Sequence, residues 1–575
     1  MFGAGETAQV GAGFCEGLRH GRQDQARARW RRHGPNDGGQ AICTGKQVLS
    51  DDLNATESLV FAMNNNSSHV LPSARGRTLN LEACQLQTWE WTMICEPSDC
   101  LDPADWDALR AQGHRMMDDM FDFMERLGED PVWRPIPAST RARFRAPLPT
   151  APTTLESAHA SFMSDVLPYA VGNAHPGFMG WVHGGGTAVG MLAEMLAAGL
   201  NANVGGRDQM PVEVERQITN WMANLLGFPA TASGLFVTGT SMANLLAVLV
   251  ARTRALGVGV RHSGIASAPL PLVAYTSKEA HQCVGQALDI CGLGISALRR
   301  IRVDAERRMD VAALETAIDE DRRAGRIPFM VVATAGTVDT GAIDPLAEIA
   351  IVARRNALWF HVDGAYGALA CLSDELRPLL TGISHADSIA FDFHKWGQVP
   401  YDSGFVLVRD GACHQEAFAA PAAYLGRESR GLAAGSPWPC DLGPDLSRGF
   451  RALKTWFTLK VYGTQQLGRV IAHTCVLARY LAQRVAETPE LELMASVTLN
   501  IVCFRYRAEP ARVDRLNRDI VLELHESGLA VPSTTRLQGA LVIRCALVNH
   551  RTRQRDVDTL LEAVVRIGRN FGVQQ

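Results

Sequence analysis

Four side chains suited to covalent and acid–base chemistry follow separate apolar runs in the middle of this 575-residue chain. Lys395 stands in SIAFDFHKWGQVPYDSG, just past an alternating apolar run and before a turn-rich cluster. Asp363 ends the run WFHVD, His281 follows PLVAY, and Ser241 follows GLFV. Each residue type alone is more often structural, as a solvated lysine, a capping side chain or a packed histidine. Their shared position at predicted strand ends favours a common site.

The segment TGTSMANL predicts an anion cradle. Gly239, Thr240 and Ser241 open a helix after the apolar GLFV, so backbone N–H groups, hydroxyls and the positive end of the helix dipole would face a phosphate. No Gly-Lys-Ser/Thr sequence follows, which disfavours an ATP-binding P-loop.

A phosphate cradle, a flat ring, a carboxylate and an amine, in that chain order, match the needs of pyridoxal 5'-phosphate (PLP). Asp363 would pair with the pyridine nitrogen and His281 would stack on the ring. Lys395 would form the Schiff base, its amine made nucleophilic by partly desolvated surroundings and by His394 and Trp396 beside it.

Short apolar runs alternate with helical patterns through the middle of the chain. The helical stretch DVAALETAIDEDRRAG has Asp310 as a predicted cap, and DPLAEIAIVARRNA has Asp344 as a cap with Pro345 in its first turn. This alternation predicts an α/β fold with a mainly parallel sheet and ligands beyond the carboxyl ends of its strands. The predicted strands are PLVAY, RIRVD, PFMVVAT, WFHVD, DSIAF and GFVLV.

The rhythm of the sequence predicts four regions. Residues 1–97 are an extension of uncertain order without sustained periodicity, to which no function is assigned. Residues 98–185 form a helical segment, with an apolar stripe in DPADWDALRAQGHRMMDDMFDFMERLG for core or partner packing. Residues 186–455 form the large cofactor-binding domain, and residues 456–575 form a smaller α+β domain.

Several spaced motifs resemble those of the group II PLP-dependent amino-acid decarboxylases, the relatives of aromatic-L-amino-acid, histidine and glutamate decarboxylases. The resemblance runs from about residue 100 to the C-terminus. It implies PLP-dependent fold type I with a seven-stranded large-domain sheet, an N-terminal segment that wraps a partner subunit, and a homodimer. The motifs are HPGFMGWV, TGTSMANL, YTSKEAHQCV, TAGTVDTGAIDPL, HVDGAYG, ADSIAFDFHKW and RALKTWF.

The same resemblance assigns roles to single residues. Lys395 resembles the Schiff-base lysine, and Thr240 and Ser241 resemble phosphate binders. Tyr424, in APAAYLG, is similar to a tyrosine on a mobile catalytic loop that returns a proton to the α-carbon, and it favours amine over aldehyde as the product. Asp392 stands where the aromatic decarboxylases have an asparagine. The remaining cofactor contacts that the resemblance implies are His281, Thr337, Asp363, Ala365 and His394.

Two departures from the family pattern concern the same site. The second threonine of the family's GTT sequence is Val338 here, so one contact is lost and Thr337 is the available substitute. HGGGT, residues 183–187, replaces a bulkier stretch near the substrate pocket of the animal enzymes. The substrate preference of those enzymes therefore does not transfer.

The expected activity is decarboxylation of an L-amino acid to its amine. Trp181 and Phe178 favour an aromatic or hydrophobic substrate. The alternatives are an acidic substrate, an aldehyde-forming relative, or a catalytically silent dimeric scaffold. A remote alternative is a metal-dependent hydrolase, but no HExxH spacing is present and Lys395 would have no task. Its candidate ligands are His281, His361, Asp363 and His394.

The composition and charge of the sequence indicate which binding partners and which cellular location to expect. A net charge of -4 without a basic cluster disfavours nucleic-acid binding. No run approaches eighteen apolar residues, so we expect no membrane span. The N-terminus lacks the features of a secretory signal and the thirteen cysteines form no CxxC pair, which favours a cytoplasmic protein with reduced thiols.

Overall fold

A computed structural model describes residues 100–420 and 426–573. Glu96–Gln575 forms one compact unit. The predicted extension over residues 1–97 and the candidate proton donor Tyr424 lie outside the described residues. No helix within the described ranges is both long and apolar enough to cross a lipid bilayer.

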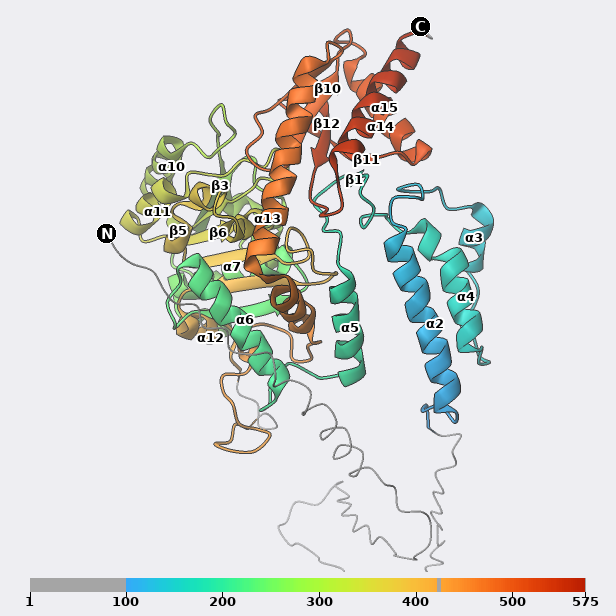
Figure 1. The fold of residues 1–575 in the computed structure, drawn as a ribbon. Coiled ribbons are helices and arrows are strands. Elements are labelled where there is room, and N and C mark those ends of the chain that lie inside the picture. The colour runs from blue at the N-terminus through green and yellow to red at the C-terminus, as the bar shows by residue number, and fades with distance from the viewer. Residues whose placement is uncertain (1–99, 421–425, 574–575) are drawn as a thin grey trace, which may run out of the picture. The chain divides into compact units, whose positions relative to one another are not determined.

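A seven-stranded sheet forms the centre of the large domain (Figure 1). Strand β8 is antiparallel to both of its neighbours, and all other neighbouring strands are parallel. The sequence prediction of a mainly parallel seven-stranded sheet is therefore confirmed. In spatial order the strands are β2 (Ser233–Val237), β8 (Gly404–Val408), β7 (Ser388–Asp392), β6 (Trp359–Asp363), β5 (Ile327–Thr334), β3 (Leu272–Ser277) and β4 (Leu298–Ile301).

Alternate side chains of these strands enter two separate cores. Phe236 and Tyr275 pack into one core, whereas Leu235 and Ala274 pack into the other. This two-residue period is what a sheet covered on both faces requires. The first core is completed by α6 (Met210–Leu226), α10 (Val311–Arg323) and α11 (Leu346–Arg355). The second core is completed by α7 (Thr240–Leu256), α9 (Cys283–Ile290) and α12 (Gly411–Phe418).

The two predicted helix caps have different outcomes. Asp310 caps α10, because its carboxylate accepts a hydrogen bond from the backbone N–H of Ala313 at 2.9 Å. The prediction for Asp344 is wrong, since Pro345 occupies the N-cap position of α11. The Asp344 carboxylate instead accepts from the backbone N–H groups of Met309 and Thr334, and burial raises its pKa to about 6.

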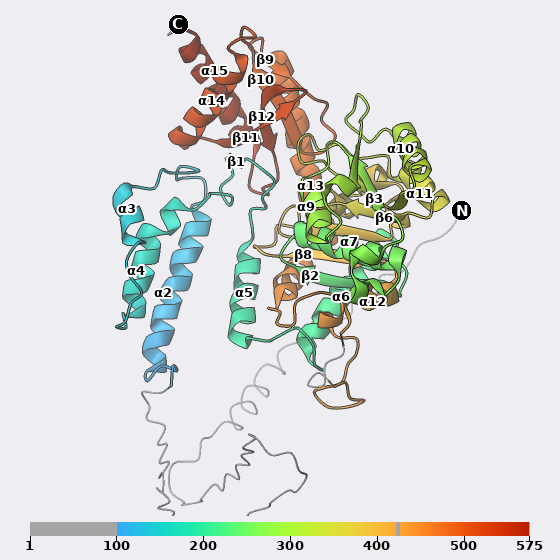
Figure 2. The ribbon, with the colours of Figure 1, turned by 180° about the vertical axis from the view of Figure 1, so that it is seen from behind.

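The smaller C-terminal domain is of the predicted α+β type, and its sheet has five strands (Figure 2). Its edge strand β1 (Phe178–Met179) comes from the segment before the large domain and pairs in parallel with β11 (Val531–Leu537). The domain boundaries drawn from the sequence stay predictions. The other strands are β12 (Ala540–Ala546), β10 (Ile501–Tyr506) and β9 (Leu491–Leu493), and the helices are α14 (Val513–Ser527), α15 (Gln554–Val573) and α13 (Arg451–Glu487), which breaks at Gly463.

The predicted helix with an apolar stripe is α2 (Trp106–Glu125), which lies beside α4 (Leu155–Asp165) in both ribbon views (Figures 1 and 2). The described residues cover its stripe only in part, because Trp106 is 57% exposed and Gln112 is the only residue of the helix that is buried. The remaining N-terminal helices are α3 (Ala138–Arg143) and α5 (Ala188–Leu200).

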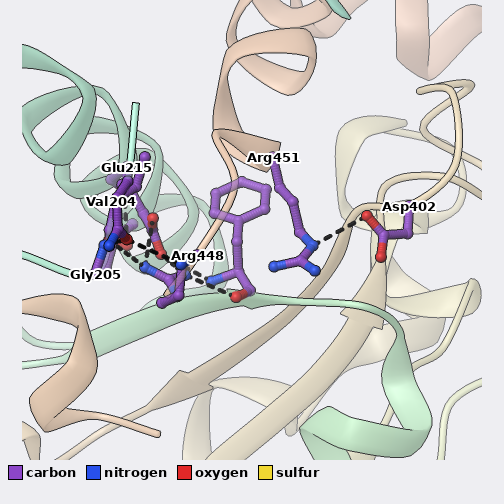
Figure 3. Close-up of polar contacts among 9 residues, drawn as sticks. Val204, Gly205, Glu215, Asp402, Arg448 and Arg451 are labelled. Carbon is purple, nitrogen blue, oxygen red and sulfur yellow. Dashed lines mark hydrogen bonds and ion pairs between the residues drawn. The ribbon is translucent and has the colours of Figure 1, made fainter. Parts of the chain in front are cut away.

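A buried ion pair fixes the chain just before α13 (Figure 3). Arg448 and Glu215 are 3% and 4% exposed, and their side chains meet at 2.7 Å. The Arg448 guanidinium also donates to the backbone carbonyls of Val204 and Phe236, while Glu215 accepts from the backbone N–H of Phe236. This cluster joins α6, β2 and the start of α13 on one side of the sheet.

Candidate active site

A cavity of about 380 Å³ opens at the carboxyl ends of β5, β6 and β7. This is the edge of an α/β sheet at which ligands are expected to bind. Eight of the residues predicted from the sequence line it, namely Thr240, Ser241, His281, Asp363, Ala365, Asp392, His394 and Lys395. Thr337 does not line the cavity, and Tyr424 lies outside the described residues.

Lys395 is held by a carboxylate rather than left as an isolated amine. Its Nζ lies 2.9 Å from Oδ2 of Asp392, whose Oδ1 accepts a hydrogen bond from the backbone N–H of Thr240 at 2.7 Å. Burial lowers the pKa of Lys395, but the carboxylates of Asp392 and Asp363 outweigh it and hold the pKa above its ordinary value. The amine is therefore charged in the cofactor-free chain, unlike the desolvated nucleophile expected from the sequence.

Asp363 ends β6 and is 2% exposed. Its Oδ2 accepts from Nδ2 of Asn244 at 3.0 Å, and its Oδ1 accepts from the backbone N–H of Ala365 at 3.1 Å. Burial raises the pKa of this carboxyl, while the hydrogen bond from Asn244 and the charge of Lys395 lower it. The strand end thus presents a buried, donor-supported carboxylate to the cavity.

Helix α7 begins at Thr240, with Gly239 at its N-cap, and its N-terminus faces the cavity. The hydroxyl oxygen of Thr240 is buried and has no hydrogen-bond partner among the described residues. Buried polar atoms are rarely left without partners, and a helix N-terminus binds phosphate well. The residues present therefore fit PLP, with its phosphate at Thr240 and Ser241, its ring nitrogen at Asp363 and its aldehyde carbon at Lys395.

His281 contributes a flat, uncharged ring to the cavity wall. Its Nδ1 accepts from the backbone N–H of Cys283 at 3.2 Å. Burial lowers the pKa of this histidine, although the Asp363 carboxylate opposes the shift. A neutral imidazole at this place suits stacking on an aromatic cofactor ring.

The two sequence neighbours of Lys395 separate in the structure. His394 lines the cavity, its ring centroid lies 4.2 Å from that of Tyr401, and burial lowers its pKa to about 4. Trp396 points into the core, where its indole N–H donates to Oγ1 of Thr474 on α13 at 3.1 Å. Trp396 therefore anchors the turn that carries Lys395 and does not reach the amine.

The substitute contact proposed for the missing family threonine finds no support in this geometry. Thr337 is fully buried, and its hydroxyl accepts from the backbone N–H of Ala342 at 3.0 Å and pairs with Thr340 at 3.1 Å. Val338 lines the cavity instead. A cofactor role for Thr337 stays a sequence prediction.

The HGGGT stretch passes directly against the backbone of the lysine turn. A Cβ on Gly184 would lie 2.4 Å from the carbonyl oxygen of His394 and 2.5 Å from that of Lys395, so only glycine allows this approach. His183, just before it, lines the cavity with Trp181 and Tyr401. Its ring stacks on the rings of Phe178 and Trp181, and burial lowers its pKa.

Sequence reasoning missed two residues of this site, Asn244 and Tyr401, whereas His183 belongs to the HGGGT stretch that the resemblance placed near the substrate pocket. Asn244 lies four positions after Thr240 on a helix, so it shares the cavity-facing side of α7, and that spacing was a usable signal. Tyr401 carried no such signal, because a loop brings it to the cavity from outside the strand pattern. Phe178, predicted as a pocket residue, is buried in β1 beneath this wall.

Within residues 100–420 and 426–573 no group of three or more His, Cys, Asp or Glu side chains is arranged to bind a metal ion. Of the candidate ligands of the hydrolase alternative, His361 does not line the cavity, and His394 is already bonded to the backbone. His361 bonds to Asn244 and Ser388 behind Asp363, and Nδ1 of His394 accepts from the backbone N–H of Ser403.

Comparisons with known proteins agree with this site. The family model described as the pyridoxal-dependent decarboxylase conserved domain matches residues 137–507. An aromatic-L-amino-acid decarboxylase from Bacillus atrophaeus is 34% identical over 453 residues, which cover 77% of this chain and 92% of that protein. An L-2,4-diaminobutyrate decarboxylase from Rhizobium meliloti is 33% identical over 422 residues, covering 73% and 83% of the two chains.

A solved structure extends the agreement to the fold. The crystal structure of Oryza sativa TDC with PLP and tryptamine superposes with a TM-score of 0.75 at 26% identity, covering 82% of this chain and 100% of that chain. From its motifs, its cavity and its relatives, the chain belongs to the pyridoxal-dependent decarboxylase family, fold type I enzymes that use PLP to release carbon dioxide from amino acids.

Proposed function

We propose that this chain holds PLP covalently through Lys395 and converts an aromatic L-amino acid into its amine and carbon dioxide. One observation carries the proposal. The cavity that contains Lys395, Asp363 and the open hydroxyl of Thr240 is also walled by Trp181 and Tyr401. The cofactor residues and a wall suited to an aromatic side chain therefore share one space.

The chain supplies binding and orientation around the cofactor. When bound, PLP provides an electron sink for the bond that breaks. Asp363 holds a negative charge where the ring nitrogen would lie, and the N-terminus of α7 with Thr240 holds the phosphate. His281 limits the tilt of the ring. Lys395 would give up its ion pair with Asp392 when its amine reacts, whereas Asp392 would keep the hydrogen bond from the backbone N–H of Thr240.

The closing proton transfer needs an acid. We assign this step to Tyr424, which would donate its phenol proton to the substrate α-carbon after carbon dioxide leaves. Replacing Tyr424 with Phe is expected to lower amine formation and raise aldehyde output, measured by chromatography of the products. An unchanged product ratio would show that Tyr424 does not donate this proton. Another residue would then decide between amine and aldehyde as the product.

The charges in the cavity favour an aromatic substrate over a cationic or acidic one. Among the described lining residues the carboxylates are Asp363 and Asp392, and both are already bonded to donors. Lys395 is the only lysine or arginine in the same set. A substrate with a charged side chain would therefore lack a dedicated counter-charge, whereas the rings of Trp181, His183 and Tyr401 offer stacking surfaces.

The decisive assay is release of carbon dioxide and amine from a panel of amino acids by the purified protein with added PLP. Tryptophan, tyrosine, phenylalanine and their hydroxylated forms are expected to react, with kcat/KM at least about tenfold above that for glutamate or 2,4-diaminobutyrate. Preference for either charged substrate would overturn the aromatic assignment. Release of no carbon dioxide from any amino acid by PLP-loaded protein would favour the silent scaffold.

We also propose a homodimer located in the cytoplasm. Exposed apolar side chains gather on α5, where Met195, Leu196 and Leu200 are 48%, 48% and 59% exposed, and Trp106 on α2 is 57% exposed. Such surfaces are usually covered by a partner. Light scattering coupled to size exclusion is expected to give twice the chain mass, and a monomer at micromolar concentration would contradict the proposal.

A further inference from the structure

A chain of hydrogen bonds runs from Asp363 away from the cavity and into the sheet. Oδ2 of Asp363 accepts from Nδ2 of Asn244 at 3.0 Å, and Oδ1 of Asn244 lies 2.8 Å from Nε2 of His361. Nδ1 of His361 lies 2.8 Å from the hydroxyl of Ser388, which accepts from the indole N–H of Trp359 at 2.8 Å. The five side chains come from α7, β6 and β7 and are all less than 9% exposed.

The two residues at the ends of this row of hydrogen bonds, Trp359 and Asp363, determine the direction of every hydrogen bond in it. The indole of Trp359 can only donate, and an ionised Asp363 can only accept. Asn244 must then turn its amide nitrogen toward Asp363, so its oxygen accepts from Nε2–H of His361. Because burial lowers the pKa of His361 to about 3, the ring carries one proton, and Nδ1 must accept the hydroxyl proton of Ser388. All four hydrogen bonds therefore point toward Asp363.

The opposite arrangement leaves a donor without a partner. If a protonated Asp363 donated to Asn244 through Oδ2, the amide would turn over and His361 would donate from Nδ1 to Ser388. The Ser388 hydroxyl would then receive two hydrogen bonds, and its own proton would have no acceptor among the described residues. Ser388 is fully buried, so this unmet donor carries a penalty.

We propose that Asn244, His361, Ser388 and Trp359 are positioning residues that hold Asp363 ionised and aimed at the ring nitrogen of PLP. This inference rests on the cofactor placement proposed above and adds the residues that keep its counter-charge in the required state. Burial alone would drive Asp363 toward its neutral form, since it raises the pKa of that carboxyl. The donors lined up behind it oppose that change from the side that the cofactor does not reach.

The sharpest test uses cofactor binding and spectrum, which need no substrate. Asn244→Ala and His361→Phe are expected to weaken PLP binding to the apoprotein at least about tenfold, the effect of losing a hydrogen bond to a charged group. They should also shift the midpoint of the pH-dependent change in the bound-PLP spectrum by about one pH unit. His361→Gln keeps an N–H donor toward Asn244, so it should restore binding and midpoint toward the wild-type values.

A matched control separates positioning from general loss of packing. Asn517 is also fully buried and makes three hydrogen bonds, to the backbone of Tyr506 and Val513 in the small domain. Asn517→Ala should lower the unfolding temperature while leaving PLP affinity and spectrum unchanged. If His361→Phe does not fold, Asn244→Ala carries the test against this control.

The outcomes distinguish this inference from the proposed function. Unchanged PLP affinity and spectrum in Asn244→Ala, or equal shifts in Asn517→Ala, would overturn the positioning role and leave the decarboxylase assignment intact. Wild-type protein that binds PLP but releases no carbon dioxide would sink the proposed function. In that case weaker PLP binding in Asn244→Ala with rescue in His361→Gln would still support the positioning role.

Discussion

Two ion pairs in the large domain have different surroundings. Around Arg448 and Glu215, both carboxylate oxygens and both terminal guanidinium nitrogens make protein contacts, and of this pair only Nε of Arg448 lacks a partner among residues 100–420 and 426–573. At Lys395 and Asp392 the lysine side chain is 22% exposed to a cavity. The hydroxyl of Thr240 beside it has no hydrogen-bond partner in the described part of the chain. A polar cluster closed by protein atoms supports the fold, whereas one left open toward a cavity is prepared for a ligand.

The largest effect is expected when Lys395, the lysine that faces the cavity, is replaced. Lys395→Ala should remove turnover, because no other amine among the described lining residues can hold the cofactor covalently. Borohydride reduction followed by peptide mass analysis should find a pyridoxyl group on Lys395 in the wild type and none in the variant. Lys454 provides the control, since it is a buried lysine that pairs with Glu194 at 3.0 Å away from the cavity lining.

Lys454→Met should therefore keep the trapped pyridoxyl group on Lys395 even if its unfolding temperature drops. A label that persists elsewhere in Lys395→Ala, together with residual decarboxylation, would contradict the assignment of the open ion pair.

Breaking the ion pair between Arg448 and Glu215 should lower stability and leave PLP binding unchanged. Glu215→Gln leaves the Arg448 charge buried without its partner, which is expected to lower the free energy of unfolding by about 3 to 5 kcal/mol. The fraction that remains folded should bind PLP as the wild type does. Chemical denaturation and PLP titration of the same preparation measure the two effects separately.

The double variant Glu215→Leu with Arg448→Met sharpens this prediction. It removes both charges and should recover much of the lost stability, because a buried pair often contributes little over apolar residues of similar size. A double variant as unstable as Glu215→Gln would mean that the backbone contacts of Arg448 carry the stability.

The open cluster could be predicted from the sequence and the closed one could not. Lys395 and Asp363 follow strands whose alternation is readable, and β6 and β8 match their predicted bounds WFHVD and GFVLV. The partners Arg448 and Glu215 stand 233 positions apart, and no local pattern links them. Spacing along the chain indicates chemistry at strand ends, whereas contacts between distant segments depend on the finished fold.

The same limit explains the local errors. Asp344 has the residue type and position of a helix cap, but its carboxylate is drawn to two backbone donors of neighbouring segments. Strand β1 has only two residues, and its pairing with β11 bridges more than 350 positions, so no periodicity could reveal it. Asp363 and Asp392 were both predicted as residues of the site. The ion pair between Lys395 and Asp392 could not be predicted, because it depends on how the turn after β7 folds.

A smaller effect is expected at the unmet hydroxyl. Thr240→Val keeps the shape of the side chain and removes an oxygen that makes no hydrogen bond within the described residues. The apoprotein should therefore be no less stable, while PLP binds roughly tenfold more weakly, as expected for one lost hydrogen bond to a charged group. Equal loss of apoprotein stability and PLP affinity would instead mean that Thr240 supports the fold, as the ion pair of Arg448 and Glu215 does.

An effect that depends on pH is expected at a histidine that holds the HGGGT stretch. Nε2 of His550 donates to the backbone carbonyl of Gly186, at 3.0 Å, and burial together with the charge of Arg551 lowers its pKa to about 4. Between pH 6.5 and about 4 the unfolded chain binds a proton that the folded chain does not. The stability contributed by neutral His550 is present above pH 6.5 and is lost as the pH falls, by up to about 1.4 kcal/mol per pH unit.

His550→Gln keeps a donor for Gly186 and removes the titration, so the free energy of unfolding should fall less steeply below pH 6.5 than in the wild type. Denaturant unfolding at pH 7, 6 and 5 measures the slope. PLP affinity at pH 7 should stay within about twofold of the wild type, because no titrating group of the open cluster is changed. A wild-type slope in the variant would show that other buried histidines, such as His414, whose pKa burial lowers to about 4, carry the acid sensitivity of the fold.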